Sequence, residues 1–313
     1  MIFPAVIYLD QNKWIDLARA VKKPDDFPEN YSVLEWLVKQ VRANEAVVPL
    51  SFTNIYETHK INDLERRKHL AWVQATLSQG IVFRGRSALL RVQIIDHFRS
   101  TNDLEPLDRL QNWFLSNLHF EAISDYNPDV FGFSISNMLI DKFKANPQHA
   151  LYDYLANLDE STRREAVKTY SKGTLDLLSR MLKRTELLRT ETLALRKRAY
   201  AASLLIEHLD LIFSITKELN LPISTISDLG PSRTKAIIGK VPVFDIEREL
   251  AVKMENENRL IDENDLRDVS ALYTVLPYAD IIVGEQAIIN RARQAKLGER
   301  YNTKLFTKIT ELL

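Results

Sequence analysis

Carboxylate side chains follow several short apolar runs of this 313-residue sequence. Asp10 comes directly after residues 5–9 (AVIYL), Glu57 lies beyond residues 46–50 (AVVPL), and Glu285 follows residues 281–283 (IIV) after one glycine. A short apolar run that leads into a helical pattern is typical of a buried strand in a parallel sheet. Because sites in such sheets form at the carboxyl ends of the strands, we expect these acids to meet at one edge.

Further acids precede the late strand. Asp265 and Asp268 open a helical stretch and, being three residues apart, share a face of that helix, while Asp280 stands at the entry of the strand. Carboxylates gathered this closely either raise one another's pKa or bind a cation, and Mg²⁺ and Mn²⁺ prefer carboxylate and water ligands. Such an ion can activate water for in-line attack on a phosphodiester. The predicted chemistry is therefore phosphodiester hydrolysis or phosphoryl transfer.

Each acid also has an ordinary structural explanation, and these alternatives stay open at the level of sequence. An acid can cap a helix, suit the positive end of the helix dipole, stand in a turn or face solvent. These roles would explain Asp10, Glu57, Asp265, Asp268, Asp280 and Glu285 one at a time. Their joint placement is what favours a functional site.

The elements that would position the acids lie at the two ends of the chain. Strand patterns also occur at residues 81–83 and 304–306, whereas residues 88–220 are helical almost throughout, with helices predicted at 107–118, 161–187 and 191–219. Residues 221–242, with three prolines and two glycines, are predicted to be a linker. We expect an α/β fold in which residues 1–87 and 231–313 together form the parallel sheet and its helices. Residues 88–230 are then a helical insertion that splits this sheet in sequence. Two consecutive domains are the alternative.

Composition excludes several classes of protein. The chain has 42 basic and 42 acidic residues, 8 glycines and no cysteine, which excludes a disulfide scaffold, a zinc–cysteine site and a globally basic nucleic-acid binder. No segment resembles a membrane span or a signal peptide, so a cytoplasmic protein is expected. Local basic groups remain candidates for binding nucleic acid: Lys183 and Arg184 in one helical stretch, and Arg291, Arg293 and Lys296 after Glu285.

Three segments together resemble the PIN-domain family of metal-dependent ribonucleases. They are YLDQN (residues 8–12), SFTNIYE (51–57) and DLRDVSALYTVLPYADIIVGEQ (265–286), in the order that the family has them. The resemblance implies a three-layer sandwich around a central parallel sheet, here with a large all-helical insertion. It also implies a Mg²⁺ or Mn²⁺ site with metal-binding or catalytic roles for the matched acids. These acids are Asp10, Glu57, Asp268 (with Asp265 as its rival) and either Asp280 or Glu285, which compete for the last place. Asn12 and Ser51 would have supporting roles.

The resemblance implies an endoribonuclease that cleaves RNA, with a toxin or phage-defence role expected by analogy. The helical insertion would select the substrate or mediate self-association. One departure from the family is Gly284, where a Thr or Ser often precedes the last acid. Two rival predictions are an inactive PIN-like scaffold that binds RNA or protein, and a metal-independent ribonuclease of the helical HEPN type that uses Arg91 and His97.

Overall fold

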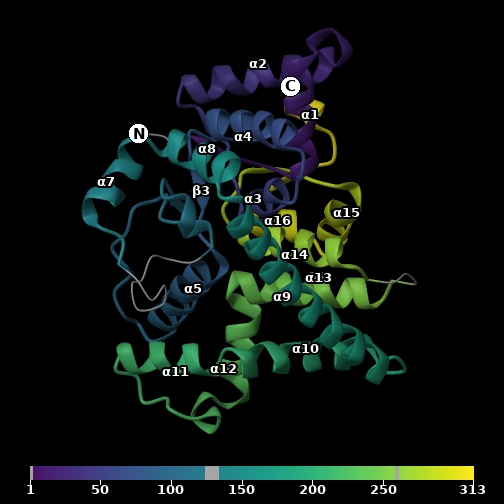
Figure 1. The fold of residues 1–313 in the computed structure, drawn as a ribbon. Coiled ribbons are helices and arrows are strands. Elements are labelled where there is room, and N and C mark those ends of the chain that lie inside the picture. Colours follow the sequence, from purple (N-terminus) through teal and green to yellow (C-terminus); the bar gives the residue numbers. More distant parts are fainter. Residues whose placement is uncertain (1–2, 124–133, 258–260) are drawn as a thin grey trace.

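A four-stranded parallel sheet forms the centre of the α/β part of the protein. The computed structural model describes residues 3–123, 134–257 and 261–313 (Figure 1). The strand order is β2-β1-β5-β6, with β1 at Ala5–Leu9, β2 at Ala46–Val47, β5 at Ile281–Val283 and β6 at Lys304–Phe306. β1 pairs with β2 through its first residues and with β5 through its last three. The two ends of the chain thus share one sheet.

A small antiparallel pair continues this sheet on the side of β2. β3 (Val82–Phe83) pairs with β4 (Leu115–Ser116), and Leu50, just beyond β2, forms a parallel bridge with Val82. The strand predictions at residues 5–9, 281–283 and 304–306 are confirmed, and those at 46–50 and 81–83 are confirmed in shorter form.

Helices cover both faces of the sheet, because β1 alternates its side chains between two hydrophobic clusters. Val6 and Tyr8 belong to one cluster and Ile7 and Leu9 to the other. The cluster around Ile7 and Leu9 is covered mainly by helices from the first half of the chain: α1 (Gln11–Lys22), α2 (Pro28–Arg42), α3 (Phe52–His59), α4 (Leu64–Ser78) and α8 (Pro147–Asn157).

The cluster around Val6 and Tyr8 is covered by helices from the middle and the end of the chain. They are α5 (Arg86–Thr101), α9 (Glu160–Leu187), α10 (Leu193–Glu207), α11 (Leu209–Glu218), α12 (Ile226–Lys240), α13 (Pro242–Glu255), α14 (Glu263–Val275), α15 (Gln286–Gln294) and α16 (Leu297–Tyr301). α7 (Asn137–Ala145) packs against α8. Short 3₁₀ turns complete the fold at Pro24–Asp26, His119–Ala122 and Ile309–Leu312.

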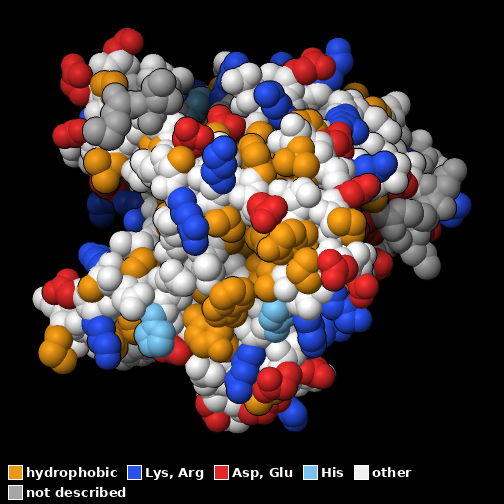
Figure 2. Space-filling view, turned by 90° about the horizontal axis from the view of Figure 1, so that it is seen from above, with side chains coloured by type: hydrophobic (Ala, Val, Ile, Leu, Met, Phe, Trp, Pro, Cys, Tyr) orange, Lys and Arg blue, Asp and Glu red, His pale blue; other side chains and the backbone are white. Residues whose placement is uncertain are grey.

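The helices spread along the long direction of the view in Figure 1. There, α2, α4 and α8 lie at the top, α10, α11 and α12 lie at the bottom, and α3, α14 and the diagonal α9 lie between them. Figure 2 looks onto the top and shows hydrophobic side chains gathered near the centre of that face, among scattered charges. One exposed apolar side chain on α4 is Trp72, which retains 50% of its accessibility.

Three predictions for the middle of the chain are wrong or incomplete. Residues 107–118 form turns and β4 rather than a helix, and 191–219 is two helices joined with a 59° bend instead of one. Residues 221–242 contain α12 rather than a linker. Gly230, with a φ of 62°, interrupts α12, and Pro231 then occupies the first turn of the continuing helix, where the missing N–H costs nothing.

The helical middle shares a hydrophobic core with the α/β part. The cluster that contains Val6 and Tyr8 also contains Leu89 of α5, Leu204 of α10 and Leu272 of α14. The division into 1–87, 88–230 and 231–313 stays a prediction. Among the described residues no single helix is long and apolar enough to cross a membrane. The bent pair of α10 and α11, taken together, reaches that length and apolar composition.

Candidate active site at the carboxyl edge of the sheet

A pocket of about 550 Å³ opens at the carboxyl ends of β1 and β5. Asp10 follows β1, Glu285 follows β5, Glu57 lies on α3 and Asp268 on α14, and all four acids line this pocket. The structure therefore brings together four of the predicted acids, from segments that are far apart in sequence.

The carboxylates of Asp10 and Glu285 are not used as helix caps. Asp10 occupies the N-cap position of α1 and Glu285 that of α15, both with extended backbone, yet neither side chain makes a capping hydrogen bond. Glu285 instead accepts a hydrogen bond from the amide of Asn12, the predicted supporting residue. Helix capping therefore does not explain these two acids, and both line the pocket.

Asp10 and Asp268 have raised pKa values. Burial, reinforced by the negative charges of Glu285 and Glu57, raises the pKa of Asp10 to about 6, although the backbone N–H of Gln11 opposes this rise. Burial and the charges of Asp10 and Glu285 raise the pKa of Asp268 to about 8. Both carboxyl groups thus lie where burial and neighbouring carboxylates disfavour their ionised forms, and a bound cation would favour those forms.

Glu57 has a cationic partner inside the pocket. Arg267, which is only 5% exposed, places its Nε 2.7 Å from Oε1 of Glu57 and its Nη1 2.6 Å from Oε1 of Glu263. Ser171 of α9 also donates to Glu263, at 2.8 Å. Glu57 is therefore charge-compensated by Arg267, in contrast to Asp10 and Asp268.

Asp265 has a structural role. It closes the N-terminal capping box of α14 with Asp262, and its Oδ1 lies 3.1 Å from Nη1 of Arg291. Asp268, one turn further along α14, lines the pocket. The structure therefore separates the two rivals and places Asp268 with the other acids.

Asp280 lies at the opposite edge of the sheet. Its Oδ2 accepts a hydrogen bond of 2.7 Å from the backbone N–H of Val6, at the start of β1. The structure does not bring Asp280 into the pocket, so of the two competitors only Glu285 lies with Asp10.

The predicted supporting residue Ser51 belongs to a buried polar network beneath the pocket. Ser51 caps α3 in a capping box with Asn54 and contacts the Tyr8 hydroxyl at 3.2 Å. Asn54 donates to the carbonyl of Leu9, one residue before Asp10. The network continues through side-chain hydrogen bonds among Gln11, Thr58 and Gln74. Satisfied buried networks of this kind hold their backbone in one arrangement, and here that backbone carries Asp10.

The donor set fits a hard divalent cation, but the ligands do not form a complete cage. Oxygen ligands line the pocket, and Asp10, Asp268 and Glu285 are the residues that could hold Mg²⁺ or Mn²⁺. Within the part of the chain that the structure describes, no group of three His, Asp or Glu side chains is arranged to hold an ion as it stands. Glu57 would have to leave Arg267 to join them.

The basic residues that the sequence favoured do not line the pocket. Arg291 is 4% exposed and pairs with Glu257 at 2.6 Å as well as with Asp265. Arg184 is half-buried, pairs with Glu255 and stacks on Tyr200. Three others are exposed but lie outside the pocket: Lys183, Arg293 and Lys296. Arg291 and Arg184 are thus structural, which their sequence positions did not indicate.

Several polar residues of the pocket were missed by sequence reasoning. They lie on the segment after α3, at the start of α4 and on α14: Lys60, Asn62, Arg66, Asn264 and Arg267. The only signal was their closeness in sequence to Glu57 and Asp268, and no motif singles them out.

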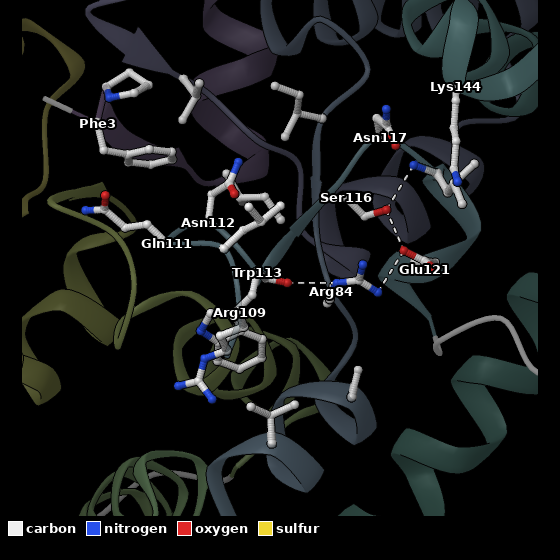
Figure 3. A pocket seen from close by; sticks show the side chains of 18 of the residues that line it. Phe3, Arg84, Arg109, Gln111, Asn112, Trp113, Ser116, Asn117, Glu121 and Lys144 are labelled. Atoms are coloured by element: carbon white, nitrogen blue, oxygen red, sulfur yellow. Dashed lines mark hydrogen bonds and ion pairs between the residues drawn. The ribbon is translucent and has the colours of Figure 1, made fainter. Parts of the chain in front are cut away.

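A larger cavity, of about 1050 Å³, lies at the amino edge of the sheet, with Phe3, Val47 and Ile81 in its wall (Figure 3). The two arginines on its lining are paired with acids: Arg84 lies 2.8 Å from Glu121 and Arg109 lies 2.5 Å from Asp96. None of the predicted acids lines it. It is therefore not the site that the sequence predicted.

Arg91 and His97 of the metal-independent alternative both lie on α5. A separation of six residues places them about 120° apart around a helix. Arg91 pairs with Glu218 of α11, and the ring of His97 packs on that of Phe98 at 5.9 Å. No observation favours this pair as a site.

The chain was compared with models of protein families, with curated proteins and with solved structures, and none of them matches it.

Proposed function

We propose that this protein is a divalent-metal-dependent endoribonuclease of the PIN-like type. One observation carries the proposal: Asp10, Asp268, Glu57 and Glu285 line one pocket at the carboxyl edge of a parallel sheet. The parallel order β2-β1-β5-β6, with helices on both faces, is compatible with the sandwich that the sequence resemblance implies.

The side chains have distinct roles in this proposal. Asp10 and Asp268 would hold the cation, whose positive charge would favour the ionised form of Asp268, a carboxyl group whose pKa burial and Asp10 raise. Asn12 fixes the carboxylate of Glu285 toward them. When bound, Mg²⁺ or Mn²⁺ supplies the Lewis-acid chemistry that activates water and stabilises charge on a phosphodiester during in-line hydrolysis.

The Glu57–Arg267 pair has a different role. Because Arg267 already compensates the charge of Glu57, this pair sets the position of α14 relative to α3. Separating α3 from α14 would break this ion pair and leave Arg267 buried without Glu57, which is costly. The pair therefore keeps α14, and with it Asp268, close to α3.

The test is cleavage of a labelled total-RNA pool with Mn²⁺, with Mg²⁺ and with EDTA. We compare wild type with Asp10→Asn and with a matched pair, Glu285→Gln and Asp280→Asn. Metal-dependent cleavage that is lost in Asp10→Asn and Glu285→Gln but kept in Asp280→Asn is the expected result. An amide oxygen at position 280 can still accept the hydrogen bond from Val6, so this control should keep its fold.

Other outcomes contradict the proposal in distinguishable ways. Cleavage that persists in EDTA and in Asp10→Asn but is lost in His97→Ala would favour the metal-independent alternative. RNA binding without any cleavage by wild type would favour the inactive scaffold.

A further inference from the structure

The lining of the acidic pocket includes a set of five side chains that donate hydrogen bonds, alongside Ile61 and Asp63 of the same segment. We call this set the donor wall, and it comprises Lys60, Asn62, Arg66, Asn264 and Arg267. We propose that the donor wall binds the phosphates that flank the scissile bond, with Lys60 and Arg66 as the substrate-positioning residues. This inference rests on the proposed function.

The two amides of the donor wall have their oxygen atoms occupied. Oδ1 of Asn62 accepts a hydrogen bond of 3.2 Å from Arg163, and Oδ1 of Asn264 accepts one from Arg267. An asparagine side chain has two further N–H donors on its nitrogen. Each amide is thereby oriented, and no hydrogen bond from its NH₂ group to another described residue occurs, so this group can donate to a ligand.

The charges of the wall are only partly neutralised. Arg66 is exposed, and no side-chain partner for its guanidinium occurs among residues 3–123, 134–257 and 261–313. Nζ of Lys60 lies 3.9 Å from Glu57, which Arg267 already approaches to 2.7 Å. Asp63, the acid between them, caps α4 by accepting from the backbone N–H of Arg66 at 2.8 Å. Two cations of this segment therefore remain for an anionic ligand.

Two buried arginines hold the segment that carries the wall. Arg67 donates to the carbonyl of Ile61 at 2.7 Å, and Arg163 donates to the carbonyl of His59. Both arginines pair with Glu160, and Arg163 is only 2% exposed. Arginines of like charge repel each other, so their joint burial requires these acceptors.

The consequence is a pre-organised segment. Residues 59–62 are fixed from both sides, by α4 through Arg67 and by α9 through Arg163. Pre-organised donors lose little entropy when a ligand binds. The helical middle of the chain thus contributes to substrate binding through Arg163, although it supplies none of the pocket's acids.

A phosphodiester backbone is the ligand class that fits this arrangement. It offers only acceptor oxygens and negative charge, which match ammonium, guanidinium and amide N–H groups. A single carboxylate, or a small ligand that only binds the metal, would not require hydrogen-bond donors from two helices and a loop. The wall also adjoins Asp10 and Asp268, so a strand held there places a phosphate beside them.

The test measures binding without catalysis. A fluorescent single-stranded RNA is titrated in EDTA with the full-length Asp10→Asn protein, and anisotropy gives the affinity between about 50 and 200 mM salt. Lys60→Gln and Arg66→Gln are added singly to that background. The matched controls are Lys39→Gln and Arg42→Gln, two exposed cations of α2 that lie outside the pocket. Melting temperatures verify that every variant is folded.

We expect each wall variant to weaken binding about tenfold and to reduce the slope of log K against log salt by about 0.7. The controls should change neither quantity. In active protein, the same changes should raise KM and leave kcat nearly constant, because they affect binding that substrate and transition state share.

The result that overturns the inference is equal behaviour of wall and control variants. If wild type cleaves RNA and the wall variants bind normally, this inference fails and the proposed function stands. If wild type never cleaves RNA but the wall variants alone lose binding and salt dependence, the phosphate-binding wall stands and the proposed function fails.

Discussion

Replacing Asp268 with asparagine should make the metal-free protein more stable at alkaline pH. Folding raises the pKa of this carboxyl group from 3.8 to about 8, mainly by burial and by the charge of Asp10. The folded state therefore binds more protons than the unfolded state between these values. The stabilisation that the protonated carboxyl provides is complete below about pH 4 and is lost as the pH rises toward 8. Asparagine has no proton to lose, so the variant lacks this part of the pH dependence.

The size of the effect follows from the shift. A change of about four pKa units, at 1.36 kcal/mol each, sets a ceiling of about 5 kcal/mol. Asp268 is partly exposed to the pocket, and water there screens its charge. We therefore expect about 2 kcal/mol at pH 8, which corresponds to a rise in melting temperature of roughly 5 °C for a chain of this size. Near pH 4 the two proteins should be about equally stable.

The assay is urea unfolding in EDTA across this pH range, for wild type, Asp268→Asn and the exposed control Asp25→Asn. A second series adds Mn²⁺ at pH 8. Wild type should gain about 2.7 kcal/mol at a metal concentration of 100 times Kd, and Asp268→Asn should gain much less. Parallel pH profiles for wild type and Asp268→Asn would show that Asp268 is not destabilised by its neighbours, and would refute the reasoning on which the metal site depends.

Two further predictions concern arginines. Arg291→Met should lower the free energy of unfolding by about 3 kcal/mol, because it removes a buried guanidinium that pairs with Glu257 and with Asp265, and it should leave the RNA affinity of the folded protein unchanged. Urea unfolding and anisotropy measure the two quantities, and a loss of affinity without a loss of stability would contradict the prediction. Arg163→Gln should weaken RNA binding about tenfold, because it releases the segment that carries Asn62, and Arg163→Lys should restore part of the affinity, because one donor to the His59 carbonyl is regained. Equal affinities for wild type and Arg163→Gln would show that Arg163 does not position the donor wall.

The acids of the site could be predicted because their positions follow from local sequence and chain connectivity. Asp10 and Glu285 each come just after a strand, so parallel pairing of β1 with β5 brings them to one edge. The same rule separates Asp280 from Glu285: they flank β5 at opposite ends, and three residues of strand span roughly 10 Å. The hydrogen bond from Val6 fixes Asp280 at the amino edge.

The basic residues and the middle of the chain could not be predicted in the same way. The sequence shows that Arg291 is charged, but not that Glu257, thirty-four positions away, is its partner. Residues 107–118 have apolar side chains at helical spacing. In the structure Trp113 and Phe114 pack on Tyr278 instead, with ring centroids 5.5 and 4.5 Å apart, and Leu115 joins β4. Tertiary packing here overrides a weak helical pattern.

Buried ion pairs explain why the helical middle cannot be treated as an appendage to the sheet. α13 presents Glu247 to Arg86 of α5, and Glu255 to Arg184 of α9, with both carboxylates almost completely buried. Removing either arginine would leave a buried carboxylate without this cationic partner, which costs far more than an exposed pair contributes. Together with the clamp of Arg163 on residues 59–62, these pairs tie the helices to the segment beside the acids. The donor wall that we propose to bind phosphate is therefore held in place partly by helices that the sequence alone would assign to a separate insertion.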